Sequence, residues 1–499
     1  MSRALNRSNP LQSLIHSMNE QEIDLLKKYL TVFASRKDEE PKTMRLLEFL
    51  VKNKEIVTDE DCALYVYEKK KDNQFEKLKS RLKQKTLHAL INDINIDRNK
   101  EWDEIEVIAI KLRKRLSQYS FLSFSRPNQP MALVILDEII GLAKTYEIYS
   151  ILIEALRYKK YYLGYRFGRL YYKRLDNIIS HYQKCNHEMM LAHESYIQTI
   201  VYKNFSSVSN NITFKRDLKI AFEKIKMRSK GLLSQNIRFY QLLIERFYYF
   251  LCENFRGTKI RELKMLKLVQ EQPSLNRKAR IGNALRYLSE SEIYLGQFLA
   301  AADYAKKAKL YMQVNSLNYH LCQETEFLAN LYSGNYQDAL VISNNIIQSY
   351  SNDKQDFWKS KYLFYNAVAL FKNKDYHLAL KKLRINTSLS NDKTGWDIGI
   401  RILIIQTLIE LNYIDQCSNQ IESLRKHIHR TDKERKIKFR DKLILRFLVS
   451  LDRNSFNIKH TIDTEYALMR KLNGKTREFK WAYFSHELFP FQDWVFSKK

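Results

Sequence analysis

Glycine and proline are scarce in this chain: 11 glycines and 6 prolines stand among 499 residues, whereas average usage would supply roughly 60 of the two together. β-Sandwiches, β-propellers and collagen-like chains need many such residues, so the composition excludes them. A Rossmann or P-loop enzyme is also disfavoured. The apolar fraction of 45% and the aromatic fraction of 13% exclude a disordered chain. The composition therefore predicts an almost wholly helical, soluble protein.

Cysteine is also rare in this chain. The five cysteines are Cys62, Cys185, Cys252, Cys322 and Cys417, and no two of them are closer than 67 residues. This spacing and the odd count exclude a zinc ribbon, a redox Cys-x-x-Cys motif and a disulfide framework. A reducing compartment fits such a chain best, so we expect a cytoplasmic location.

Long hydrophobic runs are missing too. The best candidate, Met131 to Ala143, is interrupted by Asp137 and Glu138, so the sequence predicts no membrane span. The first residues lack the apolar region of a secretory signal, and none is expected.

Motifs for catalysis and metal binding are equally thin. The chain contains no His-Glu-x-x-His, no glycine-rich phosphate loop and no Gly-x-Ser-x-Gly. His181 and Cys185 stand one helical turn apart, with His187 nearby, but a fourth ligand is lacking in the sequence. We therefore expect a protein that is not an enzyme, with no cofactor and no metal.

Positive charge is abundant, with 85 Lys and Arg against 56 Asp and Glu and a formal net charge of +29. Residues 151–300 carry 27 basic and 12 acidic side chains. Such a balance attracts nucleic acids, acidic proteins or anionic membranes. The alternative is a basic but merely solvated helical surface.

A repeat appears in the second half of the chain. Four segments align: Leu295-Gly-Gln-Phe-Leu-Ala-Ala301, Ser333-Gly-Asn-Tyr-Gln-Asp-Ala339, Asn373-Lys-Asp-Tyr-His-Leu-Ala379 and Leu411-Asn-Tyr-Ile-Asp-Gln-Cys417. Their spacings are 38, 40 and 38 residues, and apolar helical patterns flank each one. Each segment predicts a tight reversal between two helices, with a left-handed residue at Gly296, Gly334, Lys374 or Asn412.

Two further positions recur in each segment. An apolar anchor stands two residues after the reversal (Phe298, Tyr336, Tyr376, Ile414), and a small residue follows three later (Ala301, Ala339, Ala379, Cys417). The small residue permits a close approach of the two helices. This pattern resembles the tetratricopeptide repeat (TPR) family, well over residues 283–425 and loosely over 131–280. The periods exceed the usual 34 residues, and Lys374 occupies a glycine position.

The resemblance implies an all-α fold, a TPR-like solenoid of helical hairpins, whose groove binds a protein or peptide partner. We expect four segments: an N-terminal helical domain at 1–125, an irregular hairpin region at 126–280, TPR-like repeats at 281–430, and C-terminal helices with an aromatic tail at 431–499. The groove candidates are Asn283, Arg286, Glu290, Glu324, Lys361 and Gln406. The oligomeric state stays open.

The N-terminal helices offer a second candidate surface. Helices are expected from Asn19 toward Ser35, over 42–52, from Thr58 through Tyr67, and from about Gln74. The last three resemble the helix-turn-helix part of bacterial regulators that also carry TPRs. On the last helix one face carries the nucleic-acid candidates Lys77, Arg81, Gln84, Lys85 and His88 and no acid. A winged helix should continue into a glycine-containing hairpin, and residues 92–103 contain no glycine.

Two aromatic-rich segments complete the picture. Residues 157–174 interleave seven basic and seven aromatic residues, a mixture found in single-strand binders, but core packing of Tyr161, Tyr165 and Tyr172 beside two glycines is favoured. The tail from Phe479 to Phe496 is expected to cap the apolar end of the solenoid, and docking a partner is the alternative. The leading hypothesis is a protein-binding scaffold; the second is a nucleic-acid-binding regulator.

Overall fold

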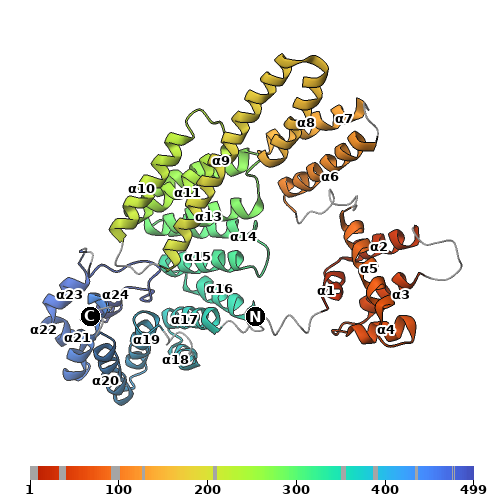
Figure 1. Ribbon diagram of the computed structural model, residues 1–499. Helices are drawn as coiled ribbons and strands as arrows, with labels where there is room; N and C mark the ends of the chain where they lie inside the picture. Colours follow the sequence, from red (N-terminus) through yellow and green to blue (C-terminus); the bar gives the residue numbers. More distant parts are fainter. Residues whose placement is uncertain are drawn as a thin grey trace. The chain divides into compact units, whose positions relative to one another are not determined.

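The computed structural model describes residues 9–32, 41–91, 102–125, 130–205, 211–349, 356–385, 392–432, 437–474, 476 and 478–498. Within these ranges every regular element is a helix, which confirms the all-α prediction (Figure 1). The chain forms two compact units, residues 1–102 and 103–499.

The first unit is a small helical domain. Its helices are α1 (Pro10–His16), α2 (Glu20–Val32), α3 (Lys42–Lys52), α4 (Asp59–Tyr67) and α5 (Asn73–Ile91). Leucines of α2, α3 and α5 fill one core with Phe75 at its centre. The predicted starts of α2 and α4 are confirmed by reciprocal caps: Asn19 and Glu22 exchange bonds of 2.8 and 2.9 Å, and Thr58 and Asp61 exchange bonds of 3.0 and 3.2 Å.

The second unit is a series of antiparallel hairpins. Its helices are α6 (Glu104–Ser125), α7 (Pro130–Thr145), α8 (Tyr149–Phe167), α9 (Arg169–Phe205), α10 (Asn211–Arg228), α11 (Gln235–Leu251), α12 (Phe255–Glu271), α13 (Lys278–Tyr294), α14 (Phe298–Lys309), α15 (Leu317–Ser333), α16 (Tyr336–Ser349), α17 (Asp356–Lys372), α18 (Tyr376–Ile385), α19 (Trp396–Glu410), α20 (Ile414–Thr431), α21 (Phe439–Arg453), α22 (Ile458–Thr464), α23 (Tyr466–Leu472) and α24 (Phe491–Phe496). Each helix from α10 to α20 packs on the next one along the chain, as Figure 1 shows for the stack.

The four predicted reversals are all present. Gly296, Gly334, Lys374 and Asn412 have φ angles of 76°, 87°, 68° and 57°. At each one the next residue's N–H reaches back five residues to a helix carbonyl, at 2.8, 2.9, 2.9 and 3.0 Å in chain order. This is the bond that closes a Schellman motif, and it satisfies a carbonyl at the helix end. The small residues that follow, Ala301, Ala339, Ala379 and Cys417, have no exposed surface.

The same reversal occurs at places where the sequence showed no signal. Glu147 and Glu253 have φ angles of 50° and 56°, and the residues after them bond back to Ala143 and Tyr249 at 2.9 and 3.0 Å. Glutamate rarely adopts this conformation, so these turns were missed. The hairpins α7–α8 and α11–α12 therefore share the turn of the four units recognised from the sequence.

The second unit is accordingly an α-solenoid of TPR-like helical hairpins. Helix α6, which the four-segment division placed with the N-terminal domain, packs on α7 and belongs to the second compact unit.

Candidate functional site: the groove face and the C-terminal segment

The first helices of successive hairpins, α11, α13, α15, α17 and α19, form one side of the solenoid, which we call the groove face. The six groove candidates lie on α13, α15, α17 and α19. Most of them are engaged within the protein.

Arg286 and Glu290 belong to a buried ion network with α11 and α12. Arg246 donates to Glu262 at 2.6 Å and to Glu290 at 2.9 Å, while Arg286 donates to the other oxygen of Glu290. The ring of Tyr287 lies under both guanidinium groups, 3.8 Å from that of Arg246. Burial raises the pKa of the Glu262 carboxyl to about 7 although Arg246 opposes the shift. These charges join three helices.

Glu324 and Lys361 form a second network between α15 and α17. The Lys361 ammonium lies 2.7 and 2.9 Å from the two carboxylate oxygens of Glu324. The hydroxyls of Tyr362 and Tyr365 donate to the same carboxylate at 3.3 and 3.1 Å. Three donor groups make four hydrogen bonds to this carboxylate, so the pair holds neighbouring hairpins together.

Gln406 on α19 is buried and faces the C-terminal segment, which we define as residues 478–498. Together with Phe364, Val368 and Ile402 it lines a small space shared with residues 486–489 and 491 of that segment, in which about 20 Å³ is accessible to water. The groove-face positions of the third and fourth units are therefore filled by the chain itself.

The C-terminal segment crosses four successive hairpins at one repeated position, two residues before each left-handed turn residue. Tyr294 stacks on Phe484 with ring centres 5.6 Å apart, and Tyr332 packs against Tyr483 at 5.0 Å. The ammonium of Lys372 lies 3.9 Å from the centre of the Phe489 ring. Glu410 accepts bonds from Trp494 Nε1 and from Lys498 Nζ, each at 2.7 Å.

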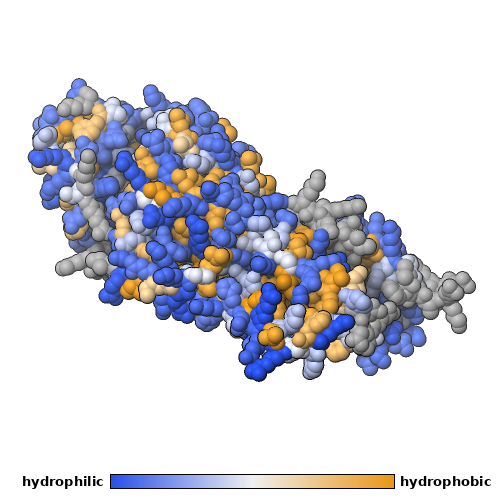
Figure 2. Space-filling model, turned by 90° about the horizontal axis from the view of Figure 1, so that it is seen from above, coloured by the Kyte–Doolittle hydropathy of each residue, from blue (hydrophilic) through white to orange (hydrophobic). Residues whose placement is uncertain are grey.

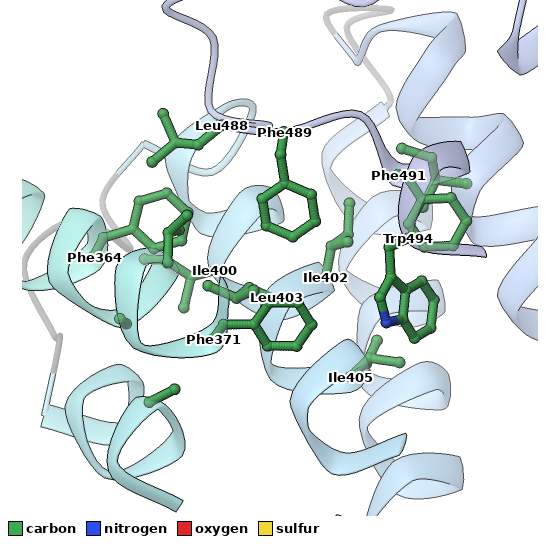
Figure 3. Close-up of a cluster of buried hydrophobic side chains, with 14 of the residues drawn as sticks. Phe364, Phe371, Ile400, Ile402, Leu403, Ile405, Leu488, Phe489, Phe491 and Trp494 are labelled. Carbon is green, nitrogen blue, oxygen red and sulfur yellow. The ribbon is translucent and has the colours of Figure 1, made fainter. Parts of the chain in front are cut away.

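Helix α19 lets the segment come close because it carries a glycine at the contact. A Cβ atom at Gly399 would lie 2.5 Å from the carbonyl oxygen of His486. Figure 3 shows Leu488, Phe489, Phe491 and Trp494 of the segment gathered with the apolar side chains of α17 and α19.

Arg440 on α21 holds the segment from the other side. Its guanidinium donates to both oxygens of Glu487 at 2.6 and 2.7 Å, to Gln492 at 2.6 Å, and to the carbonyls of Leu472 and Phe479 at 2.9 and 2.7 Å. Arg440 is 4% exposed, so five hydrogen bonds compensate the burial of its charge. The expectation that the tail caps the end of the solenoid is therefore corrected: the tail lies along the groove face.

The nucleic-acid candidates lie together on α5. Lys77, Arg81, Gln84 and His88 are exposed and Lys85 is half-buried, while Phe75, Leu78, Leu82 and Ala89 on the opposite face are buried. Lys71, just before α5, is paired with Asp59 at 3.2 Å and with Glu76 at 2.7 Å. Residues 92–101, where a wing would follow, lie outside the described part of the chain.

The basic and aromatic segment at 157–174 forms the end of the α8–α9 hairpin, which bends at Gly168 with φ 84°. Close packing holds at Gly164, where a Cβ would lie 2.9 Å from the Tyr172 ring. Tyr165 is nevertheless 94% exposed and Tyr161 is 52% exposed, so core packing of the whole stripe is wrong. On the largely hydrophilic face drawn in Figure 2, hydrophobic residues gather in several patches.

Within the described ranges of the chain, no group of three or more His, Cys, Asp or Glu side chains is placed to hold a metal ion; His181 Nε2 and Cys185 Sγ lie 3.7 Å apart. None of the helices in these ranges has the length and apolar character that a bilayer span requires.

Comparisons with known proteins give structural similarity only. No family model matches the chain, and neither does any curated protein. Among solved structures, the apo form of RapI covers 72% of this chain and 88% of its own length, at 14% identity and a TM-score of 0.43. A signal transduction ATPase with numerous domains and a tetratricopeptide repeat sensor, from Pyrococcus horikoshii, covers 84% of this chain at 11% identity and a TM-score of 0.40, and the match spans 64% of that protein.

The hairpins and their turns define the class of this protein: a TPR-like α-solenoid joined to a small N-terminal helical domain. Its groove face holds the C-terminal segment, which ends in the short helix α24.

Proposed function

We propose that this protein is a non-enzymatic scaffold that binds an extended segment of a protein partner along its groove face. The observation that supports the proposal is that the C-terminal segment contacts Tyr294, Tyr332, Lys372 and Glu410. The same structural position in four successive hairpins contacts one non-repetitive segment, which is how helical repeats read a peptide. The bound segment acts as a built-in occupant that a partner displaces.

Capture by the full-length chain tests this proposal. The immobilised chain is incubated with native lysate, alone and with the synthetic peptide of residues 478–498 at about 10 mM, which exceeds the millimolar effective concentration of the tethered segment. We expect a retained protein that the peptide displaces. A Gly399→Ala chain should retain more of it, because the added Cβ collides with the His486 carbonyl and loosens the segment. Gly141→Ala, with open space at its Cβ, is the matched control. Failure to retain any protein that the peptide displaces would refute the proposal.

A second candidate function, nucleic-acid binding, is favoured by the exposed α5 face, on which Lys77, Arg81, Gln84 and His88 lie together. Titration of labelled duplex DNA at several salt concentrations tests it. We expect an affinity that falls steeply with salt and is lost in a Lys77/Arg81/Lys85→Ala chain. An absence of binding at about 50 mM salt would remove this candidate.

A further inference from the structure

A cavity of about 200 Å³ lies between α9, α11 and α13, away from the C-terminal segment. Its walls include the rings of Tyr196, Phe239, Tyr240 and Tyr287, and its floor includes the buried side chains of α11 to α13. The ring centres of Tyr240 lie 6.0 Å from Tyr196 and 5.7 Å from Phe239. These rings contact one another and line one part of the cavity, whose apolar wall suits an apolar group.

One cation, Arg280, faces this cavity with no carboxylate partner. Its guanidinium carbon is 4.9 Å from the centre of the Phe239 ring, and its Nη1 lies 3.5 Å from the Ser274 carbonyl oxygen. Across the described ranges no Asp or Glu oxygen pairs with it, whereas Arg246 and Arg261 on the adjacent helices both have carboxylate partners. Burial lowers the pKa of Arg280, although a side-chain hydrogen bond with Tyr240 and the charge of Asp103 oppose that shift.

The acids nearest to the start of α13 are used elsewhere. Asp103 accepts a bond from the Lys278 backbone N–H at 2.9 Å, and Glu106 lies 3.7 Å from Arg277. The first turn of α13 contains no acid. Arg280 is half-buried and bonds to neutral groups, so a guanidinium without a salt bridge in the described residues lies beside the cavity and can pair with an anion.

We propose that this cavity binds a small organic acid: one carboxylate on a flat apolar body of the size of a benzene ring. Arg280 pairs with the carboxylate, and the rings of Tyr196, Phe239 and Tyr240 enclose the body. Asn283, which also lines the cavity, supplies amide donors beside the guanidinium. Arg280, which has no salt bridge within the described residues, matches a monoanion, since a phosphate dianion would need a second guanidinium or further donors. The residues that line this cavity do not include Tyr294, Tyr332, Lys372 or Glu410, which hold the C-terminal segment, so the site is separate from the proposed partner seat.

Calorimetric titration of the full-length chain tests the site with phenylacetate and with its neutral isostere phenylacetamide. We expect phenylacetate to bind at least about tenfold more tightly, because a charge-assisted bond to a guanidinium separates the two probes. Arg280→Gln should remove that preference. Arg238→Gln, an exposed arginine on α11 outside the cavity, should leave it unchanged. Equal binding of acid and amide, or no binding of phenylacetate at millimolar concentration, would overturn the proposal.

Two further measurements distinguish loss of the site from loss of the fold, and a small acid from a peptide carboxylate. Asn283→Trp, which fills the cavity and leaves Arg280 in place, should abolish binding while circular dichroism confirms the helical fold. Hippuryl-type peptides that end in phenylalanine test the other source of a carboxylate; tighter binding of such a peptide than of phenylacetate would overturn the assignment to a small acid. Binding of phenylacetate without a displaceable protein partner would refute the proposed function alone.

Discussion

Gly399 offers the sharpest test of the C-terminal segment's position, because a single methyl group has opposite effects with and without the segment. In an exposed helix interior, Gly→Ala stabilises by about 1 kcal/mol. At Gly399, however, the new Cβ would lie 2.5 Å from the carbonyl oxygen and 3.2 Å from the carbonyl carbon of His486. Both atoms are backbone, so the segment itself must shift, and overpacking of this kind costs about 1–3 kcal/mol.

We therefore expect Gly399→Ala to change the free energy of unfolding by between about zero and 2 kcal/mol in the destabilising direction. Gly141→Ala on α7, where nothing lies within 4 Å of the Cβ, should stabilise by about 1 kcal/mol. Urea unfolding measures both values. Hydrogen exchange of residues 478–498 reports the segment directly and should accelerate only in Gly399→Ala. Equal stabilisation by both substitutions, with unchanged exchange, would refute the placement of the segment.

Substitutions at three other sites, the Arg440–Glu487 pair, Lys374 and Lys372, test the same structure. Arg440→Leu strands the buried Glu487 carboxylate and should destabilise by about 3–5 kcal/mol in urea unfolding, whereas the double variant with Glu487→Leu should recover part of that loss. Lys374→Gly should stabilise by about 1 kcal/mol, because only glycine adopts φ 68° without strain, and Lys374→Val should destabilise; a neutral Lys374→Val would contradict the turn. Burial lowers the pKa of Lys372 from 10.5 to about 8. Between these two pH values the unfolded chain still holds the proton that the folded chain has released. The free energy of unfolding should therefore rise with pH across this window. Lys372→Met should be more stable than the natural chain at pH 7, and melting curves from pH 7 to 10 should show that difference shrinking as pH rises.

Local signals in the sequence predicted the hairpins well. The turns at Gly296, Gly334 and Asn412 follow from residues that tolerate the left-handed conformation, and Lys374 was found only through its register with them. Glu147 and Glu253 adopt the same conformation, but glutamate gives no such signal, so the hairpins closed at these two residues were not predicted. The amphipathic pattern of α5 likewise placed its buried and exposed faces correctly.

Long-range pairings account for what the sequence did not show. Arg286 and Glu290 are four residues apart, so their contact is a foreseeable helix pair. Glu324 and Lys361 are 37 residues apart, and their contact depends on how two hairpins stack. The aromatic residues of the tail are evident in the sequence. Their composition alone, however, does not distinguish a tail that covers the last helix from one that lies in the groove.

The binding of the C-terminal segment to the groove also determines how tightly a partner must bind in order to displace it. The residue two positions before the turn differs from unit to unit: Tyr294, Tyr332, Lys372 and Glu410. Each contacts a chemically matching group of the segment. The two tyrosines pack on aromatic rings, the lysine ammonium lies over an aromatic ring, and the glutamate accepts bonds from an indole N–H and an ammonium. Because the segment is tethered to the solenoid, its effective concentration at the groove is of millimolar order. A free peptide of equal affinity therefore displaces half of it only at a similar concentration, so a partner at micromolar levels must bind the groove about a thousandfold more tightly than the segment does, or must first break the Arg440 contacts that hold Glu487.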